Sequence, residues 1–220
     1  MMITFPDGSQ KAYEYGMTAL EIAETISKSL AKKAVVALFN QNLVELNLPL
    51  TEDGTLSLLT EKDPKALEAL NHSTAHLLAQ AIRNLYPNTY FGVGPAIDEG
   101  FYYDVDFGDE KINDQDLEKI ENEMKRLVEK GDDIERRAVS YETAKDIFSQ
   151  DPYKLELIEA HRAEGLTVYT QGNFTDLCRG GHVTNTKQIK HFKLLSLAGA
   201  YWRGNSNNKM LVRIYGTSFF

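Results

Sequence analysis

Apolar residues follow the period of an α-helix between residues 63 and 86. At about 100° per residue, one side of this segment collects apolar or small side chains: Leu67, Leu70, Thr74, Leu77, Leu78, Ala81 and Leu85. Asp63 is placed to cap the free N–H groups, and Pro64 suits the first helical position, where its missing donor does no harm. The pattern predicts a helix that packs one stripe against a core.

The segment before this helix, residues 1–60, alternates short apolar runs with turn signals. The predicted order is two strands, a helix and three strands, and Thr18 with Glu21 forms a capping box at the start of that helix. This order in about sixty residues predicts a ubiquitin-like β-grasp domain. Nothing in it resembles a catalytic constellation. We interpret it as a binding or spacing module, or simply as a folding unit.

Residues 61–220 predict a second, larger α+β domain in which helices pack against a mostly antiparallel sheet. Helices are expected from residue 113, over 140–148 and over 152–160, and strands over 100–106, 166–170, 192–197, 199–203 and 210–215. Lys154 falls on one of these helices, where a lysine is by default a solvated surface charge.

Composition places the chain among globular proteins of a reducing compartment. The single cysteine excludes an internal disulfide. No apolar run approaches the ~20 residues of a membrane span, and the N-terminus lacks the basic-then-apolar order of a signal peptide. These features predict a cytoplasmic protein without a membrane partner.

Two separate segments carry candidate chemistry. His72 and His76 lie one turn apart, roughly opposite the apolar stripe, and could hold a metal, a water or a substrate, or could be a solvated pair. The segment Asp176–His182 contains the lone cysteine, Cys178, between acidic, basic and imidazole groups, and its glycines indicate a tight turn. The two motifs together are far more specific than either alone.

Charge is distributed unevenly along the chain. The formal net charge is −8, yet no Asp or Glu follows Asp176, and the basic residues beyond it are Arg179, Lys187, Lys190, Lys193, Arg203, Lys209 and Arg213. This basic tail indicates either an anionic partner on one side of the molecule or a basic surface that answers the acidic one within the fold.

Several longer motifs lie along the chain: His-Ser-Thr-Ala-His-Leu at 72–77, Gly-Phe-Tyr-Tyr-Asp at 100–104, Asp-Leu-Cys-Arg-Gly at 176–180, Ala-Gly-Ala-Tyr-Trp-Arg-Gly at 198–204, and residues 207–217. Together they resemble bacterial threonyl-tRNA synthetase. The resemblance implies a TGS domain at 1–60 and, at 61–220, an editing domain related to that of alanyl-tRNA synthetase. The family's class II catalytic core lies beyond such a segment, so we expect an N-terminal fragment that cannot activate an amino acid.

The resemblance also implies a function and a set of site residues. The expected activity is hydrolysis of the ester of seryl-tRNA(Thr), with threonyl-tRNA(Thr) spared, without a cofactor or metal. The matching catalytic positions are His72, Lys154 and Cys178; those around the substrate are His76, Tyr103, Asp176 and His182; expected tRNA contacts are Lys187, Lys190, Lys193, Arg203 and Arg213. A full-length protein is expected to form a homodimer through the core. Gly181 departs from the proline that members often have there, which puts the stiffness of the loop in doubt.

Two other functions stay open. His72, His76, Cys178 and His182 make a tetrahedral zinc set on paper, as a zinc hydrolase would use. The chain could instead be a non-catalytic tRNA-binding module. Release of serine from charged tRNA separates the hydrolases from the binding module, and metal analysis separates the two hydrolases.

Overall fold

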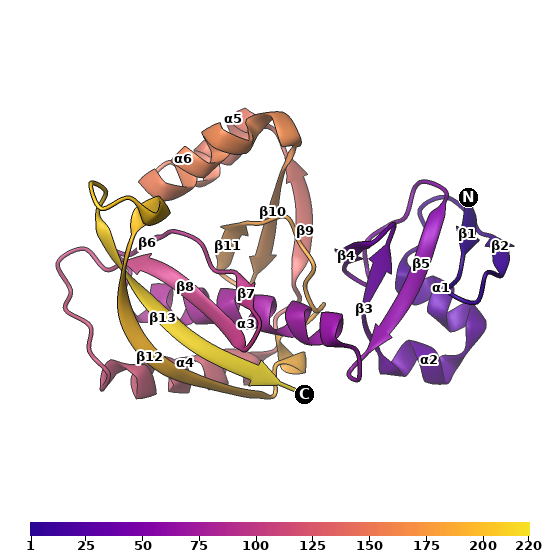
Figure 1. The fold of residues 1–220 in the computed structure, drawn as a ribbon, viewed down its shortest axis with the longest axis horizontal. Coiled ribbons are helices and arrows are strands. Elements are labelled where there is room, and N and C mark those ends of the chain that lie inside the picture. The colour runs from indigo at the N-terminus through magenta and orange to yellow at the C-terminus, as the bar shows by residue number, and fades with distance from the viewer.

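The computed structural model describes residues 1–220, and we divide it into a first domain (residues 1–60) and a second domain (residues 61–220) on either side of a short link (Figure 1). The division is our proposal from the packing. One core cluster lies wholly within residues 1–56. The larger cluster occupies the second domain, and Val35, Val36 and Leu59 of the first domain join it. The two domains therefore share apolar contacts where they meet.

The first domain is a β-grasp fold, as its sequence predicts. Its elements are β1 (Met2–Thr4), β2 (Gln10–Ala12), α1 (Ala19–Ile26), α2 (Lys28–Lys33), β3 (Ala34–Phe39), β4 (Asn42–Val44) and β5 (Gly54–Thr60). The sheet order is β2-β1-β5-β3-β4, with β1 and β5 parallel. The predicted capping box is present, since Glu21 N–H donates to Thr18 Oγ1 and Thr18 N–H donates to Glu21.

The second domain is α+β with two antiparallel sheets, where the sequence led us to expect one. Its elements are α3 (Pro64–Leu85), β6 (Tyr90–Phe91), β7 (Ala96–Ile97), β8 (Gly100–Asp106), α4 (Asp116–Lys130), β9 (Glu135–Val139), α5 (Tyr141–Ile147), α6 (Pro152–His161), η1 (Arg162–Glu164), β10 (Leu166–Gln171), β11 (Phe174–Leu177), η2 (Thr186–Gln188), β12 (His191–Tyr201), η3 (Trp202–Gly204) and β13 (Met210–Phe219). The sheets run β11-β10-β9 and β12-β13-β8-β6. None of the helices is both long and apolar enough to cross a membrane.

Helix α3 is the centre of this domain rather than an amphipathic surface helix. It contacts β8 and β13 of the larger sheet, β11 of the smaller sheet, and α4 (Figure 1). Every residue from Asn71 to Ile82 except the half-buried His72 is buried. The predicted helix and its stripe are present, and packing on several further sides buries the small and polar residues too, so the alternative of a solvated histidine pair is wrong for His76.

The start of α3 corrects a second detail. Asp63 occupies the N-cap position, and Pro64 begins the helix. The Asp63 carboxylate caps no helical N–H group, however; it accepts from the Thr60 backbone N–H at 2.7 Å. Asp63 thus fixes the turn that leaves β5, and so the direction in which α3 departs from the first domain.

Candidate active site

Four side chains that could ligate a metal meet beside the buried middle of α3. His72 and His76 come from α3, and Cys178 and His182 come from the loop after β11. One side-chain nitrogen or sulfur from each lies within 4.8 Å of every other. The Sγ of Cys178 is 3.3 Å from Nε2 of both His72 and His182. The structure thus brings together two segments more than one hundred residues apart, as their motifs led us to expect.

The accessible part of this cluster consists of His72 and Cys178, which are half-buried, whereas His76 and His182 are buried. Burial lowers the pKa of His72 to about 4, against the opposing effect of Asp176 and Glu68. Burial also raises the pKa of the Cys178 thiol to about 12. At neutral pH the site therefore presents a neutral imidazole, which can accept a proton, beside a thiol rather than a thiolate.

Lys154 is buried in this site, so its interpretation as a solvated charge is wrong. It is 3% exposed, because α6 places it on its inner side. Its Nζ donates to Tyr103 Oη at 2.9 Å and to Gly92 O at 2.7 Å, and it forms an ion pair with Asp176 Oδ1 at 2.7 Å. All three ammonium donors therefore have partners, which offsets the cost of burying this group.

The Asp176 carboxylate joins this lysine to the histidines. Its Oδ2 accepts from Tyr103 Oη at 2.6 Å and lies 3.5 Å from His76 Nε2. Asp176 and Tyr103 are each 1% exposed. Lys154, Tyr103 and Asp176 thus form a saturated polar network behind the half-buried His72 and Cys178. The structure brings together all seven residues predicted for the catalytic and substrate positions.

Ser73 is a member of the site that the sequence analysis missed, although it stands within the histidine motif. Its Oγ donates to Ala69 O and accepts from Val183 N–H, at 2.8 and 3.1 Å. The Nδ1 of His182 lies 3.0 Å from the same oxygen. Because the hydroxyl proton is used on Ala69, His182 Nδ1 must donate, which leaves Nε2 free to accept from the Cys178 thiol.

The loop between Cys178 and His182 depends on two glycines. Gly180 and Gly181 have φ of +112° and +85°. The ring of a proline fixes φ near −65°, so proline could not follow this path at Gly181. Gly181 therefore takes a backbone conformation that proline does not allow at this position.

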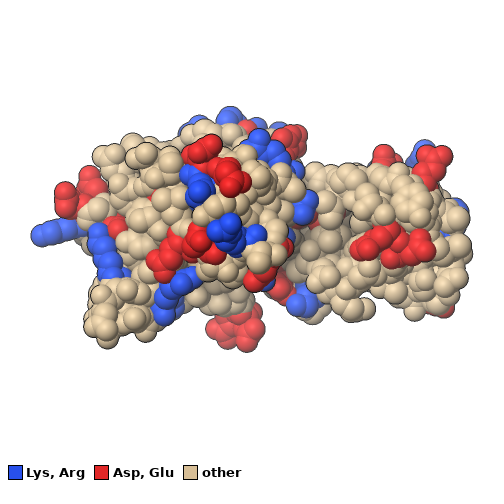
Figure 2. Space-filling model, turned by 90° about the horizontal axis from the view of Figure 1, so that it is seen from above, with Lys and Arg blue, Asp and Glu red and all other residues tan.

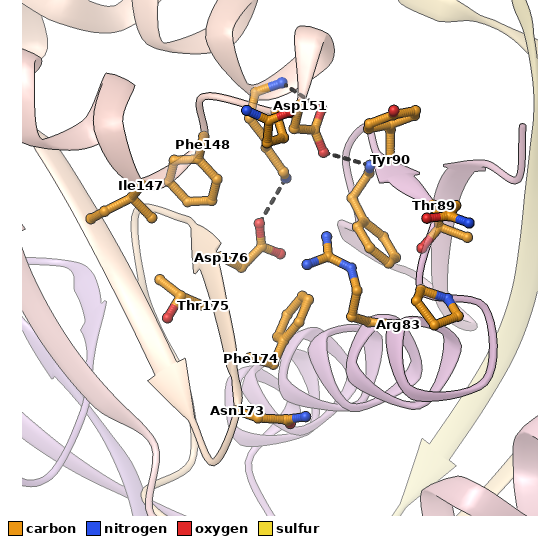
Figure 3. A pocket seen from close by; sticks show the side chains of 15 residues that line it. Arg83, Thr89, Tyr90, Ile147, Phe148, Asp151, Asn173, Phe174, Thr175 and Asp176 are labelled. Carbon is orange, nitrogen blue, oxygen red and sulfur yellow. Dashed lines mark hydrogen bonds and ion pairs between the residues drawn. The ribbon is translucent and has the colours of Figure 1, made fainter.

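Two cavities flank the cluster. One of about 500 Å³ opens beside Asp176 and Lys154, and Arg83, Phe174 and Asp151 also line it (Figure 3). Arg83 lies over the Phe91 ring, 4.8 Å from its centroid. The other, of about 190 Å³, is lined by Cys178. The smaller cavity thus reaches the cluster itself, whereas the larger one opens on the Lys154–Asp176 side of the site.

The basic tail is largely neutralised within the fold. Three of its five expected tRNA-binding residues pair with carboxylates of the same domain: Arg213 with Asp104 at 2.7 Å, Arg203 with Glu156 at 3.1 Å and Lys193 with Glu121 at 2.9 Å. Lys187 and Lys190 are exposed and belong to none of these pairs. On the face drawn in Figure 2, basic and acidic side chains are interspersed over the second domain. Much of the basic tail therefore forms ion pairs with acidic residues of its own domain.

Two of the distances among the four ligating atoms suit a tetrahedral metal, although the set as a whole spans up to 4.8 Å. Zn–N and Zn–S bonds of ~2.0–2.3 Å place ligand atoms roughly 3.3–3.8 Å apart, and both Cys178–histidine distances are 3.3 Å. With all four side chains engaged, such a site would be closed, and no position would remain for a water. It would resemble a structural zinc site more than a catalytic one.

The fold and the site together define a β-grasp module joined to an α+β domain with a buried histidine, cysteine, lysine and aspartate centre. Models of two known domains match these parts. The TGS domain matches residues 1–60, and the threonyl and alanyl tRNA synthetase second additional domain matches residues 166–215.

Whole-chain comparison gives the particular relatives. The chain is 61% identical over 218 residues to Threonine--tRNA ligase of Acholeplasma laidlawii (strain PG-8A), and 57% identical over 219 residues to those of Staphylococcus epidermidis and Staphylococcus carnosus. Each match covers 99% of this chain and 34% of the relative. The chain thus spans about a third of the length of these relatives, at their N-terminal part. The resemblance inferred from the motifs is confirmed.

Proposed function

We propose that this chain hydrolyses the ester of seryl-tRNA(Thr) and spares threonyl-tRNA(Thr), as a post-transfer editing unit. The observation that carries the proposal is the convergence of His72 and Cys178 on one accessible point, backed by the buried Lys154–Asp176 pair. The similarity to threonine--tRNA ligases and the match to the threonyl and alanyl second additional domain support a tRNA-linked substrate. Such a substrate places the reaction in the cytoplasm.

The chemistry requires one proton acceptor and a site that favours negative charge. Neutral His72 takes a proton from a water whose oxygen attacks the ester carbonyl. The tetrahedral intermediate then expels the ribose oxygen of the tRNA, which takes the proton back from His72. Lys154 has no free donor, so it acts through its positive potential and by holding Asp176 against His76.

The need for such a reaction follows from the size of the two amino acids. A synthetic site built for threonine gains only ~1–3 kcal/mol of discrimination against serine, which lacks one methyl group. A second site that admits serine and excludes threonine corrects the remaining errors by hydrolysis. Asp176, Cys178 and His182 shape the pocket around the seryl amine and hydroxyl in this proposal.

Incubation of the chain with seryl- and threonyl-tRNA(Thr) tests the proposal. We expect release of serine and retention of threonine. Loss of both amino acids at equal rates would refute the specificity. Release of neither, with tRNA still bound, would favour the non-catalytic binding module. Homodimerisation stays a prediction for a longer protein and is measured separately by its mass in solution.

The second candidate function is a zinc hydrolase, because four potential ligand atoms lie within 4.8 Å of one another. We expect hydrolysis without metal, because the Lys154 ammonium beside His76 would repel a dication and already supplies positive charge. Elemental analysis of the purified protein, with deacylation measured before and after treatment with a strong chelator, decides between them. Stoichiometric zinc, with activity lost on chelation and restored by Zn²⁺, would establish the zinc hydrolase.

Binding of tRNA should weaken with salt, and Lys187 and Lys190 should supply part of that dependence because neither is neutralised by the ion pairs of the basic tail. Charge reversal at both (K187E, K190E) is expected to reduce the slope of log K against log salt by roughly 1–2, since each phosphate contact contributes ~0.7–0.9. The control is Lys28→Glu, an exposed lysine of the first domain. An unchanged slope in the double variant would show that these lysines do not contact tRNA.

A further inference from the structure

The carboxylate of Glu45, in the first domain, is buried against the active-site loop of the second domain. Glu45 directly follows β4 and is 2% exposed. A buried carboxylate is rare unless it is paired. Its Oε1 accepts from three neutral donors of the second domain: Tyr169 Oη at 2.8 Å, Gly181 N–H at 2.9 Å and His182 N–H at 3.2 Å. One oxygen thus joins the two domains at the turn that carries His182.

The shape of this turn suits an anion. With φ of +112° and +85°, Gly180 and Gly181 direct the consecutive N–H groups of Gly181 and His182 toward the same oxygen. Successive backbone N–H groups that converge in this way form an anion-binding nest. Here the first domain supplies the anion. The two N–H groups therefore have this hydrogen-bond acceptor only when the first domain is in place.

The small space around the two glycines also shows how closely the first domain approaches this turn. A Cβ on Gly180 would lie 2.1 Å from Tyr169 Oη and 3.0 Å from Glu45 Oε1. A Cβ on Gly181 would lie 3.1 Å from Cβ of Leu43, in β4. The turn therefore has little space in which to shift while β4 remains against it.

Both the backbone and the ring of His182 are consequently held in place. Its backbone N–H is bound to Glu45 of the first domain, and its ring Nδ1 lies against Ser73 of α3. Its Nε2 is then 3.3 Å from the Cys178 Sγ, which in turn lies 3.3 Å from His72. Glu45 is thus linked to the proposed proton acceptor through His182 itself and through the contacts of Cys178 with His182 and His72.

We propose that Glu45 is a positioning residue of the active site and that the first domain completes that site. The inference rests on the proposed function, because it assigns to Glu45 the geometry of groups that hydrolyse the ester. Displacement of catalytic groups by about 1 Å can cost about 10²-fold in rate. The first domain is thus more than a spacer, although its own residues contain no catalytic group.

The test compares Glu45→Ala, Glu45→Gln and the matched control Glu52→Ala, an exposed glutamate of the same domain, in the full chain. We expect Glu45→Ala to lower kcat for seryl-tRNA(Thr) deacylation at least tenfold with KM within twofold of the parent chain. Glu45→Gln keeps an acceptor oxygen and should lose no more than about threefold. Glu52→Ala should match the parent. A parent-like kcat in folded Glu45→Ala would overturn the proposal.

Amide hydrogen exchange gives a readout that does not need catalysis. Exchange of the Gly181 and His182 amides should accelerate at least tenfold in Glu45→Ala and stay near the parent rate in Glu45→Gln. If the parent chain releases no serine, the proposed function fails and exchange alone decides the role of Glu45. Parent-like exchange in Glu45→Ala would overturn it. If Glu45→Ala does not fold, Glu45→Asp decides, because its shorter side chain withdraws the acceptor oxygen from both amides: parent-like exchange at both amides in that variant would also overturn the proposal.

Discussion

Replacing His72 by alanine is expected to reduce the deacylation of seryl-tRNA(Thr) at least tenfold, and by as much as the ~10²–10⁴-fold that one positioned proton-transfer group contributes. The reason is that His72 is the accessible imidazole of the cluster and, with a pKa of about 4, is neutral at working pH. Cys178→Ala should also lose at least tenfold, because the Cys178 thiol lies 3.3 Å from His72 Nε2 and orients that ring. Single-turnover deacylation of purified seryl-tRNA(Thr) measures both effects.

The matched control for His72→Ala is His191→Ala, which removes an exposed imidazole at the start of β12. This variant should deacylate at the parent rate. Circular dichroism and thermal unfolding establish that the variants remain folded. Parent-like rates in folded His72→Ala and Cys178→Ala would remove both residues from the mechanism and with them the proposed active site.

Lys154→Met is expected to lower the free energy of unfolding by about 3–5 kcal/mol, as well as to reduce deacylation at least tenfold. Removing one partner of a buried ion pair leaves the other charge uncompensated. Lys154 and Asp176 are 3% and 1% exposed, and their closest approach is 2.7 Å. Lys154 should therefore contribute to stability as well as to activity. Urea unfolding at pH 7 measures the difference.

An exposed ion pair supplies the control for Lys154. Lys65 and Glu68 form a pair on the first turns of α3 with 57% and 46% of their side chains exposed. Lys65→Met should therefore change the free energy of unfolding by no more than about 1 kcal/mol. In the double variant Lys154→Met, Asp176→Asn the lone buried charge is gone, and part of the lost stability should return. Equal free energies of unfolding for Lys154→Met and Lys65→Met would show that the buried network does not stabilise the fold more than an exposed ion pair does.

Local sequence patterns determined much of the fold. The capping box of Thr18 and Glu21, the strand over residues 100–106 and the helices opened by Ser140 and by Asp151–Pro152 all follow from side-chain types at fixed short spacings. Strands with weaker patterns were missed. Every residue of β9 except the half-buried Val139 is exposed, so no alternation of apolar and polar residues marks it.

The residues of the candidate site could also be named from the sequence, because two unusual motifs contain most of them. Their environment could not. His76 and Lys154 look like surface groups on their own helices, and only the packing of α3, α6 and two sheets buries them. Lys154 could be placed in the pocket by resemblance alone.

Contacts between the two domains were the feature least predictable from the sequence. Glu45 carries no local signal, since a glutamate after a short strand is usually exposed, and its partners stand more than one hundred residues away. The same is true of the basic tail, whose charge the sequence shows but whose carboxylate partners come from other strands and helices. The sequence by itself determined which chemical groups this protein has and how they are spaced along the chain. Tertiary packing decided which of them are desolvated and paired, because burial and distance are properties of the folded chain.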